Sequence, residues 1–248
     1  MTICLFDNRL RCPVEAELVP MTDEHVTVLN LTWVPEFHRR QESSEKDQDF
    51  LMWNRGVKYV DLLTQRHGVR AYVVSRAGEV QGVLALSGTP EPSRLVKIER
   101  VLIVRYLATA PWNRPALSGG ARFRWTGTVL LGQAVLDSMA AGCLGRLGLH
   151  SLNASDDFYR KLAFCDLGPD PAERGLRYFE LSVLDAARLL DRTTHLHDGD
   201  VALPAKAMQS LPAQEAHPCP AARASVAEPN DRSPYQAVNK SITGRDQP

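Results

Sequence analysis

The segment 122–131 reads RFRWTGTVLL and places Gly127 between two arginines and an apolar helix. The start of a helix carries N–H groups without intrahelical partners and a partial positive charge, so a glycine there lets the backbone close around a phosphate. Arg122 and Arg124 would add charge-assisted hydrogen bonds to phosphate oxygens. The segment therefore predicts a cradle for a phosphate-bearing cofactor. The loop residues that we expect to bind it are Arg122, Phe123, Arg124, Trp125, Thr126, Gly127 and Thr128.

This loop resembles the acetyl-CoA signature of the GCN5-related N-acetyltransferase (GNAT) family. That signature is Q/R-x-x-G-x-G/A, followed by a small or polar residue and two aliphatic residues. Trp125 stands where the first glycine of the signature belongs. The positions that match in register are Arg122, Gly127, Thr128, Leu130 and Leu131.

Two further segments resemble the same family. Residues 106–111, YLATAP, are similar to its fourth strand, whose splayed end offers backbone groups to the amides of pantetheine. This likeness assigns cofactor contacts to Leu107, Ala108 and Thr109. Residues 147–151 and 155–164 are similar to the fifth strand and the following helix, written A-x-x-F-Y-x-x-x-G-F, with Ser155 at the alanine and Ala163 at the glycine. The three motifs occur in the family's order, and the resemblance covers about residues 69–179.

Acetyl transfer from a thioester to an amine needs a neutral amine, a stabilised oxyanion and a proton for the departing thiolate. The resemblance makes Tyr159 the general acid, and a phenol with an ordinary pKa near 10 can protonate a thiolate. The alternative is a tyrosine whose ring is simply packed in the core. The oxyanion would accept a hydrogen bond from a backbone N–H among residues 107–109.

The general base has several candidates. His150 ends the strand beside the cofactor, and an imidazole can accept a proton near neutral pH, although a lone histidine is often a hydrogen-bonded structural residue. Glu99 precedes Thr109 by ten residues, about 33 Å along an extended chain, and reaches the thioester only if the segment bends. Glu36 and His38 lie where the family lines its acceptor site, or they are simply solvated.

Hydrophobic periodicity supplies the elements that must position these residues. We expect a strand at 15–19, a helix beginning near Thr22, a second helix at 50–63, and a hairpin of strands 70–75 and 79–86 joined by Arg76-Ala77-Gly78. A strand at 95–109, a helix at 128–141, a strand at 146–151, a helix at 155–163 and a strand at 177–183 follow. The predicted fold class is α/β (α+β), a GNAT-like mixed and mainly antiparallel sheet flanked by helices.

Composition narrows the function classes. The chain has 248 residues, 44% of them hydrophobic, and 29 basic against 29 acidic residues, so no global basic field favours a nucleic acid. No apolar run approaches the roughly 20 residues that span a bilayer, and we expect no membrane partner and a cytoplasmic protein. Five cysteines at irregular spacings fit neither a disulfide framework nor a zinc site, and we interpret them as free thiols without a metal.

These observations predict one acetyltransferase domain at 1–190 and a disordered tail at 191–248, which is rich in Pro, Ala, Ser and Gln. The predicted activity is acetyl-CoA-dependent transfer to a primary amine of a small molecule or a peptide. Two alternatives stay open: a catalytically inactive GNAT-like domain that serves as a CoA-binding or protein-interaction module, and a toxin-like enzyme acting on aminoacyl-tRNA, which the balanced charge disfavours.

Overall fold

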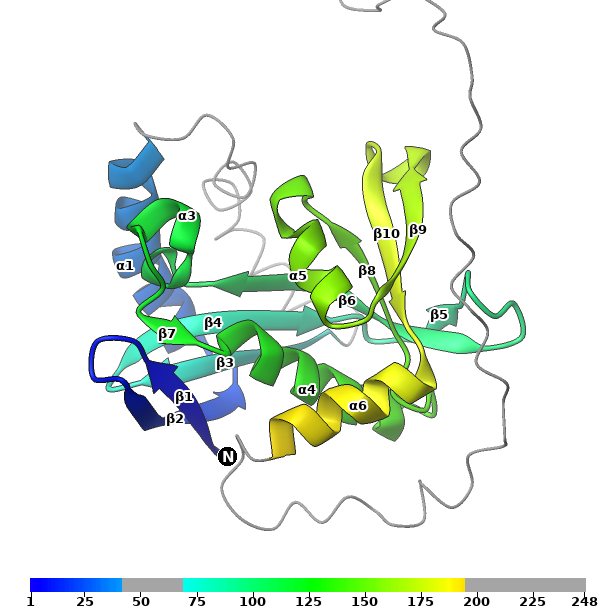
Figure 1. Cartoon of the computed structure of the whole chain (residues 1–248), viewed down its shortest axis with the longest axis horizontal. Coiled ribbons are helices and arrows are strands. Elements are labelled where there is room, and N and C mark those ends of the chain that lie inside the picture. Colours follow the sequence, from blue (N-terminus) through cyan, green and yellow to red (C-terminus); the bar gives the residue numbers. More distant parts are fainter. Residues whose placement is uncertain (42–68, 195–248) are drawn as a thin grey trace, which may run out of the picture.

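The computed structural model describes residues 1–41 and 69–194 (Figure 1). Its strands are β1 (Thr2–Asp7), β2 (Cys12–Pro20), β3 (Arg70–Arg76), β4 (Glu79–Leu86), β5 (Glu91–Pro92), β6 (Arg100–Thr109), β7 (Phe123–Arg124), β8 (Leu147–Ser151), β9 (Cys165–Asp170) and β10 (Leu176–Leu181). Its helices are α1 (Asp23–Gln41), α3 (Pro115–Ser118), α4 (Thr126–Ala140), α5 (Asp156–Lys161) and α6 (Val183–Thr194). Short 3-10 turns lie at Pro111–Asn113, Asn153–Ser155 and Pro171–Glu173.

The strands form one sheet in the order β7-β1-β2-β3-β4-β6-β8-β10-β9, with β5 paired to the outer part of β6. Among the pairs in the described residues, β6 and β8 run parallel and the others run antiparallel. The predicted fold class, a mixed and mainly antiparallel sheet flanked by helices, is confirmed. The β3–β4 hairpin is also confirmed, and both turn residues, Ala77 and Gly78, have the positive φ that a tight hairpin turn requires.

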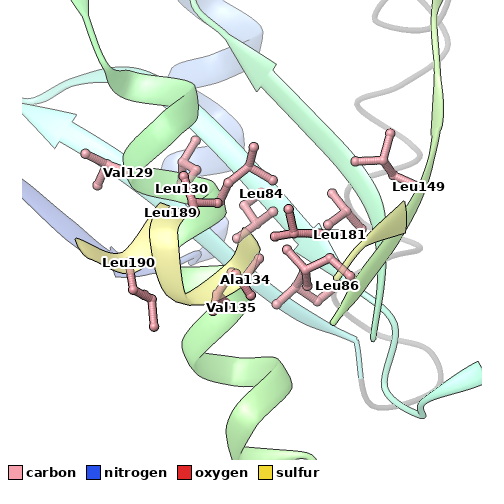
Figure 2. Close-up of a cluster of buried hydrophobic side chains, with 14 of the residues drawn as sticks. Leu84, Leu86, Val129, Leu130, Ala134, Val135, Leu149, Leu181, Leu189 and Leu190 are labelled. Atoms are coloured by element: carbon pink, nitrogen blue, oxygen red, sulfur yellow. The ribbon is translucent and has the colours of Figure 1, made fainter. Parts of the chain in front are cut away.

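Helices cover both faces of the sheet. Alternation along β3 and β4 sends Val73 and Val83 to the face that packs on α1, and Val74 and Leu84 to the face that packs on α4 and α6. Figure 2 shows the second layer, in which leucines of α4 and α6 meet those of the central strands. On the first face, Trp33 of α1 is fully buried and its indole N–H donates to the carbonyl of Val80 at 2.9 Å.

Several elements differ from the sequence-based expectations. Strands β1 and β9 and helix α6 were not expected, and the strand predicted from residue 95 begins only at Arg100. Residues 93–96 instead form a turn around the buried carboxylate of Glu180, which accepts hydrogen bonds from the Ser93 hydroxyl at 2.6 Å and the Arg94 N–H at 2.5 Å. A carboxylate 80 residues and more downstream therefore decides where the strand starts.

The C-terminal limit and the cysteines bear on the predicted domain. Helix α6 continues past Leu190 to Thr194, and Thr193 is buried, whereas residues 195–248 and the helix expected at 50–63 lie outside the described residues.

Cys4, Cys12 and Cys143 are free thiols as expected. The same expectation is wrong for Cys165, which is disulfide-bonded, and Cys219 lies outside the described residues.

No helix in the described ranges combines the length and the apolar character that a bilayer span needs. Within residues 1–41 and 69–194, no group of three or more His, Cys, Asp or Glu side chains is arranged to hold a metal ion.

Candidate functional site

Strands β6 and β8 separate in the middle of the sheet. Their parallel pairing ends at the rung between Val104 and Leu149, and β6 then continues to Thr109 beside β4. A bulge between Val104 and Tyr106 in the β4–β6 ladder falls at the same point, and bulges bend a strand and increase its twist. Figure 1 shows the result: β6 runs across the sheet while β8 turns away from it, with α5 beside the opening.

The opening exposes backbone groups of β6. The N–H of Ala110 donates to the carbonyl of Gln81 on β4 at 2.9 Å. Because backbone groups alternate between the two edges of a strand, Ala108 also turns its N–H and C=O toward β4, whereas Leu107 and Thr109 turn theirs toward the opening. The side chain of Arg114 donates to the carbonyl of Thr109 at 2.9 Å. Of the three residues predicted to contact pantetheine, Leu107 and Thr109 therefore present backbone groups on that side, and Ala108 does not.

Helix α4 begins next to this opening. A Cβ built on Gly82 of β4 would lie 2.5 Å from Thr126 Cγ2 and 3.2 Å from the carbonyl oxygen of Ala108, so the glycine lets the helix start approach β4 and β6 closely. On the other side, the ring of Phe158 from α5 lies 3.1 Å from a Cβ built on Gly127. The first turn of α4 thus lies between the end of β6 and α5, on the two sides of the opening.

The backbone at the start of α4 has the form of an anion-binding nest. Trp125 is the N-cap, with φ 75° and ψ −4°, and the first intrahelical bond runs from the N–H of Val129 to the carbonyl of Trp125 at 2.9 Å. The N–H groups of Thr126, Gly127 and Thr128 precede that bond, and no side chain caps the helix. A left-handed residue followed by helical residues points successive N–H groups at one place. The predicted cradle is thus present in the backbone.

Trp125 supplies the left-handed conformation that a glycine would adopt without strain. Its ring packs on Phe6 of β1 with centroids 5.6 Å apart and borders the main core cluster. The bulky indole ring is therefore held against β1. Packing of the ring offsets the cost of the positive φ.

The loop before α4 is held from two directions. Phe123 and Arg124 form β7, which pairs with β1, so the chain's first strand anchors the cradle. From the other direction, the side chain of Asn113 accepts a hydrogen bond from the N–H of Phe123 at 2.9 Å and donates to Gln81 of β4. Gln81 is fully buried. These bonds place the loop relative to the end of β6.

The two arginines of the predicted cradle occupy different positions. Arg122 forms an ion pair with Glu79 at 2.9 Å and lies over the ring of Phe123, 4.9 Å from its centroid. Arg124 is exposed on β7. Arg122 would have to leave Glu79 to reach a phosphate, whereas Arg124 is open to solvent. The structure therefore gives Arg122 a structural partner that the sequence did not indicate.

Tyr159 lies on α5 with its ring in the core. The residue is 6% exposed, and its ring is within 6 Å of those of Phe158, Phe164 and Phe179, measured between centroids. The ring is therefore packed in the core, as one of the two interpretations of the sequence expected. The role of the hydroxyl as general acid stays a prediction.

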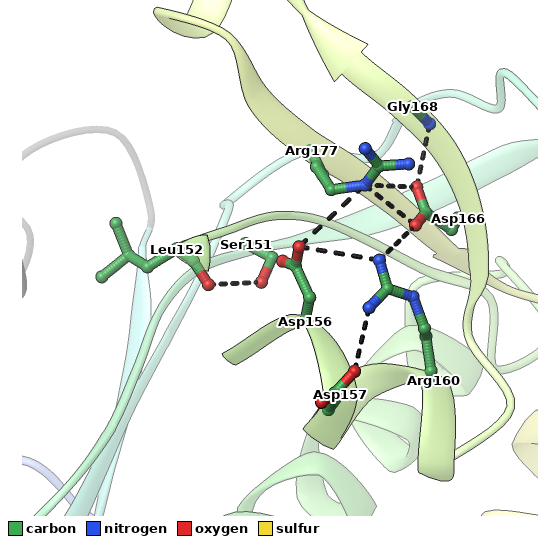
Figure 3. Close-up of polar contacts among 8 residues, drawn as sticks. All are labelled: Ser151, Leu152, Asp156, Asp157, Arg160, Asp166, Gly168 and Arg177. Atoms are coloured by element: carbon green, nitrogen blue, oxygen red, sulfur yellow. Dashed lines mark hydrogen bonds and ion pairs between the residues drawn. The ribbon is translucent and has the colours of Figure 1, made fainter. Parts of the chain in front are cut away.

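Charged side chains fix α5 against the strands that follow it (Figure 3). Asp166 of β9 accepts from Arg160 of α5 at 2.8 Å and from Arg177 of β10 at 2.9 Å, and Arg160 also pairs with Asp157 at 3.0 Å. Burial alone would raise the pKa of Asp166, but the hydrogen bonds from Arg177 and Arg160 outweigh it and lower the pKa below its usual value. The network holds α5, and with it Tyr159, beside the opening.

His150 lies one residue beyond the last rung between β6 and β8, on the face opposite to Leu149. Its Nε2 is 2.8 Å from Asp170 Oδ2, and its ring packs on Tyr178 with centroids 4.9 Å apart. Arg94 approaches the same carboxylate oxygen at 2.7 Å. The hydrogen bonds from His150 and Arg94 lower the pKa of Asp170 to about 2, so this carboxylate stays ionised.

The other candidate bases lie elsewhere. Glu99 forms an ion pair at 3.0 Å with the buried Arg146, far from the end of β6. Glu36 is buried on α1 and pairs with Arg39, so it is not the solvated carboxylate that the sequence also allowed. The side chain of His38 lies outside the described ones.

Sequence reasoning missed the partners that hold the site together, namely Gln81, Arg94, Asp170 and Phe158 in its contact with Gly127. The Asp170-Pro171 dipeptide does indicate the start of a helical turn, because aspartate often stands at the N-cap and proline often follows it. In the structure the Asp170 side chain accepts from the N–H of Ala172. Nothing in that signal indicates a contact with a histidine 20 residues earlier.

No protein-family model and no curated protein matches the sequence. The chain is similar to the solved structure of the PaiA N-acetyltransferase from Thermoplasma acidophilum in complex with coenzyme A, at 13% identity and a TM-score of 0.48, over 67% of this chain and 98% of that one. A putative acetyltransferase of the GNAT family from Desulfovibrio desulfuricans matches at 13% identity and a TM-score of 0.47, over 68% and 99%. A bacterial toxin matches at 15% identity and a TM-score of 0.48, over 75% and 98%. At these values the likeness assigns no activity to this chain.

Proposed function

We propose that the protein is an N-acetyltransferase that uses acetyl-CoA as co-substrate and needs no metal. The observation that carries the proposal is the opening between β6 and β8, where backbone groups of Leu107 and Thr109 face the gap and the N–H groups at the start of α4 lie beside its mouth. An extended chain of amides ending in a pyrophosphate fits this arrangement. The amides would pair with β6 as an added strand does, and the pyrophosphate would accept from the first turn of α4.

The reaction follows from that placement. The amine nitrogen attacks the thioester carbon, the C–N bond forms, and the C–S bond breaks as the tetrahedral intermediate collapses. His150 would take a proton from the ammonium form of the acceptor, and the backbone N–H of Leu107 or Thr109 would donate to the oxyanion. Tyr159 would protonate the thiolate of coenzyme A, and its phenolate would take the remaining extra proton from the amine nitrogen. The products are an acetylated amine and free coenzyme A.

Calorimetry with acetyl-CoA tests the proposal, and the N–H of Thr109 offers a sharp variant. Thr109→Pro removes a donor that faces the opening, and it removes no bond to β4 because that ladder uses the groups of Ala108 and Ala110. We expect acetyl-CoA affinity to fall about tenfold, the contribution of one hydrogen bond. Thr109→Val keeps the N–H and is the matched control, so its affinity should equal that of the wild type. If both variants bind acetyl-CoA equally, the N–H of Thr109 on β6 does not contact the cofactor.

An inactive domain that serves as an interaction module is the second candidate. The ion pair between Arg122 and Glu79 favours it, because the arginine expected to hold phosphate already has a partner, as does the core packing of the Tyr159 ring. Calorimetry separates the two candidates. Binding of acetyl-CoA supports the enzyme, and no binding at millimolar acetyl-CoA supports the module.

A further inference from the structure

The polar cluster around His150 has a composition that goes beyond packing. One carboxylate oxygen of Asp170, on β9, lies 2.8 Å from His150 Nε2 and 2.7 Å from Nη2 of Arg94, which belongs to the loop after β5. Arg94 also lies over the ring of Tyr178, 4.1 Å from its centroid, and the same ring packs on the imidazole. The imidazole is thereby held by a hydrogen bond at one nitrogen and by an aromatic ring at its side.

Resting on the proposed function, we infer that Asp170 and Arg94 are positioning residues that set the tautomer and the orientation of the His150 ring, so that its Nδ1 serves as the base for the acceptor amine at the opening between β6 and β8.

The tautomer follows from the partner. An ionised carboxylate only accepts hydrogen bonds, so Nε2 must carry the proton that lies between it and Asp170. A neutral imidazole has one N–H, which leaves the lone pair on Nδ1. When Nδ1 takes a proton from the ammonium form of the acceptor, the imidazolium keeps its Nε2–H on Asp170 and the amine gains its nucleophilic lone pair. Solvent later removes the Nδ1 proton.

The orientation of the ring follows from two contacts on one oxygen. The carboxylate of Asp170 accepts from Nε2 of His150, and the guanidinium of Arg94 holds the same oxygen in place. Among the described residues, the other titratable groups near this ring are Tyr178 and Glu180 on β10 and Glu91 of β5, which pairs with Arg105. Burial, followed by the charge and the hydrogen bond of Glu180, raises the pKa of Tyr178, so the phenol stays neutral. Glu180 is itself buried and accepts from Ser93 and the backbone of residues 94–95.

Nitrogen NMR of the whole chain, with labelled histidines and without cofactor, tests the inference directly. The His150→Asn variant identifies the signal. We expect the neutral ring to be protonated at Nε2. Asp170→Asn should weaken this preference, because the asparagine amide can donate to Nε2 while its oxygen still caps Ala172. Arg94→Gln keeps the carboxylate and should keep the tautomer.

Loss of the Nε2 preference in Asp170→Asn, but not in Arg94→Gln, supports the inference. An Nδ1-protonated ring in the wild type, or an unchanged tautomer in Asp170→Asn, would overturn it. These measurements need neither acetyl-CoA nor an acceptor, so they decide the positioning role even if calorimetry disproves the proposed function.

Turnover tests the base itself. With acetyl-CoA and primary amines such as spermidine and a lysine peptide, coenzyme A release should fall 10²–10⁴-fold in His150→Asn. Asp170→Asn should lower kcat with little change in the KM for acetyl-CoA, whereas Arg94→Gln, which keeps the tautomer, should lower kcat less. If His150→Asn turns over within about threefold of the wild type while calorimetry shows binding, His150 is not the base.

Discussion

The N-cap residue of α4 is Trp125, and its replacement by glycine should destabilise the protein less than its replacement by alanine. Trp125 has φ 75°, in the left-handed region, and its ring packs on Phe6. Trp125→Gly and Trp125→Ala both remove the ring, so the loss of packing is nearly the same in the two variants. Their difference in the free energy of unfolding then reports the backbone conformation at this residue.

Its magnitude comes from two opposed effects. A left-handed backbone costs an L-residue about 1–2 kcal/mol, whereas glycine adopts it freely. Glycine in turn loses about 0.5–1 kcal/mol more chain entropy on folding. We therefore expect Trp125→Gly to be more stable than Trp125→Ala by about 0.5–1 kcal/mol, although both are less stable than the wild type. At a right-handed or extended position the order would be reversed.

Urea unfolding followed by circular dichroism measures this difference, and calorimetry with acetyl-CoA measures the cradle in the same two proteins. Because the glycine keeps the direction of the N–H groups that follow it, Trp125→Gly should bind acetyl-CoA within about threefold of the wild type. An alanine variant at least as stable as the glycine variant would refute the left-handed cap. A collapse of affinity in both variants would show that the indole ring itself contacts the cofactor.

Three further predictions use the same site. Tyr159→Phe keeps the packed ring and deletes the hydroxyl, so stability and acetyl-CoA affinity should change little while turnover falls 10²–10⁴-fold; turnover within about threefold of the wild type would make Tyr159 a packing residue only. Arg122→Ala should lower acetyl-CoA affinity, because the variant lacks a guanidinium that can bind phosphate. Glu79→Gln, which frees Arg122 from its ion pair, should raise acetyl-CoA affinity. A folded Arg122→Ala variant with unchanged affinity would contradict the phosphate contact. Asp166→Asn should destabilise the protein at pH 7, because a lowered pKa in the folded state adds stability above the unfolded value of about 3.9. That stability disappears as the pH falls through the lowered folded-state pKa of Asp166, so the unfolding free energies of wild type and variant should converge with falling pH, and a constant difference would exclude the ion network as its source.

The sequence by itself determined the local elements and the backbone of the cradle. The hairpin of β3 and β4 follows from alternation and from a turn that ends in Gly78, and helix α4 follows from a glycine-containing start and an apolar stripe. These features depend on residues within about ten positions of one another, so their cause is visible in one window of sequence. The fold class and the place of Tyr159 at the start of a helix could be predicted for the same reason.

The tertiary structure decided which side chains meet. Asp170 of β9 contacts His150 of β8 across the intervening strand β10, Glu180 holds the turn before β6 from more than 80 positions away, and β1 pairs with the loop before α4. Such contacts produce no hydrophobic periodicity, because the residues next to a carboxylate in the sequence do not show whether it is buried or solvated. The direction of backbone groups also required the ladder, since the bulge after Val104 determines that Leu107 and Thr109, and not Ala108, face the opening.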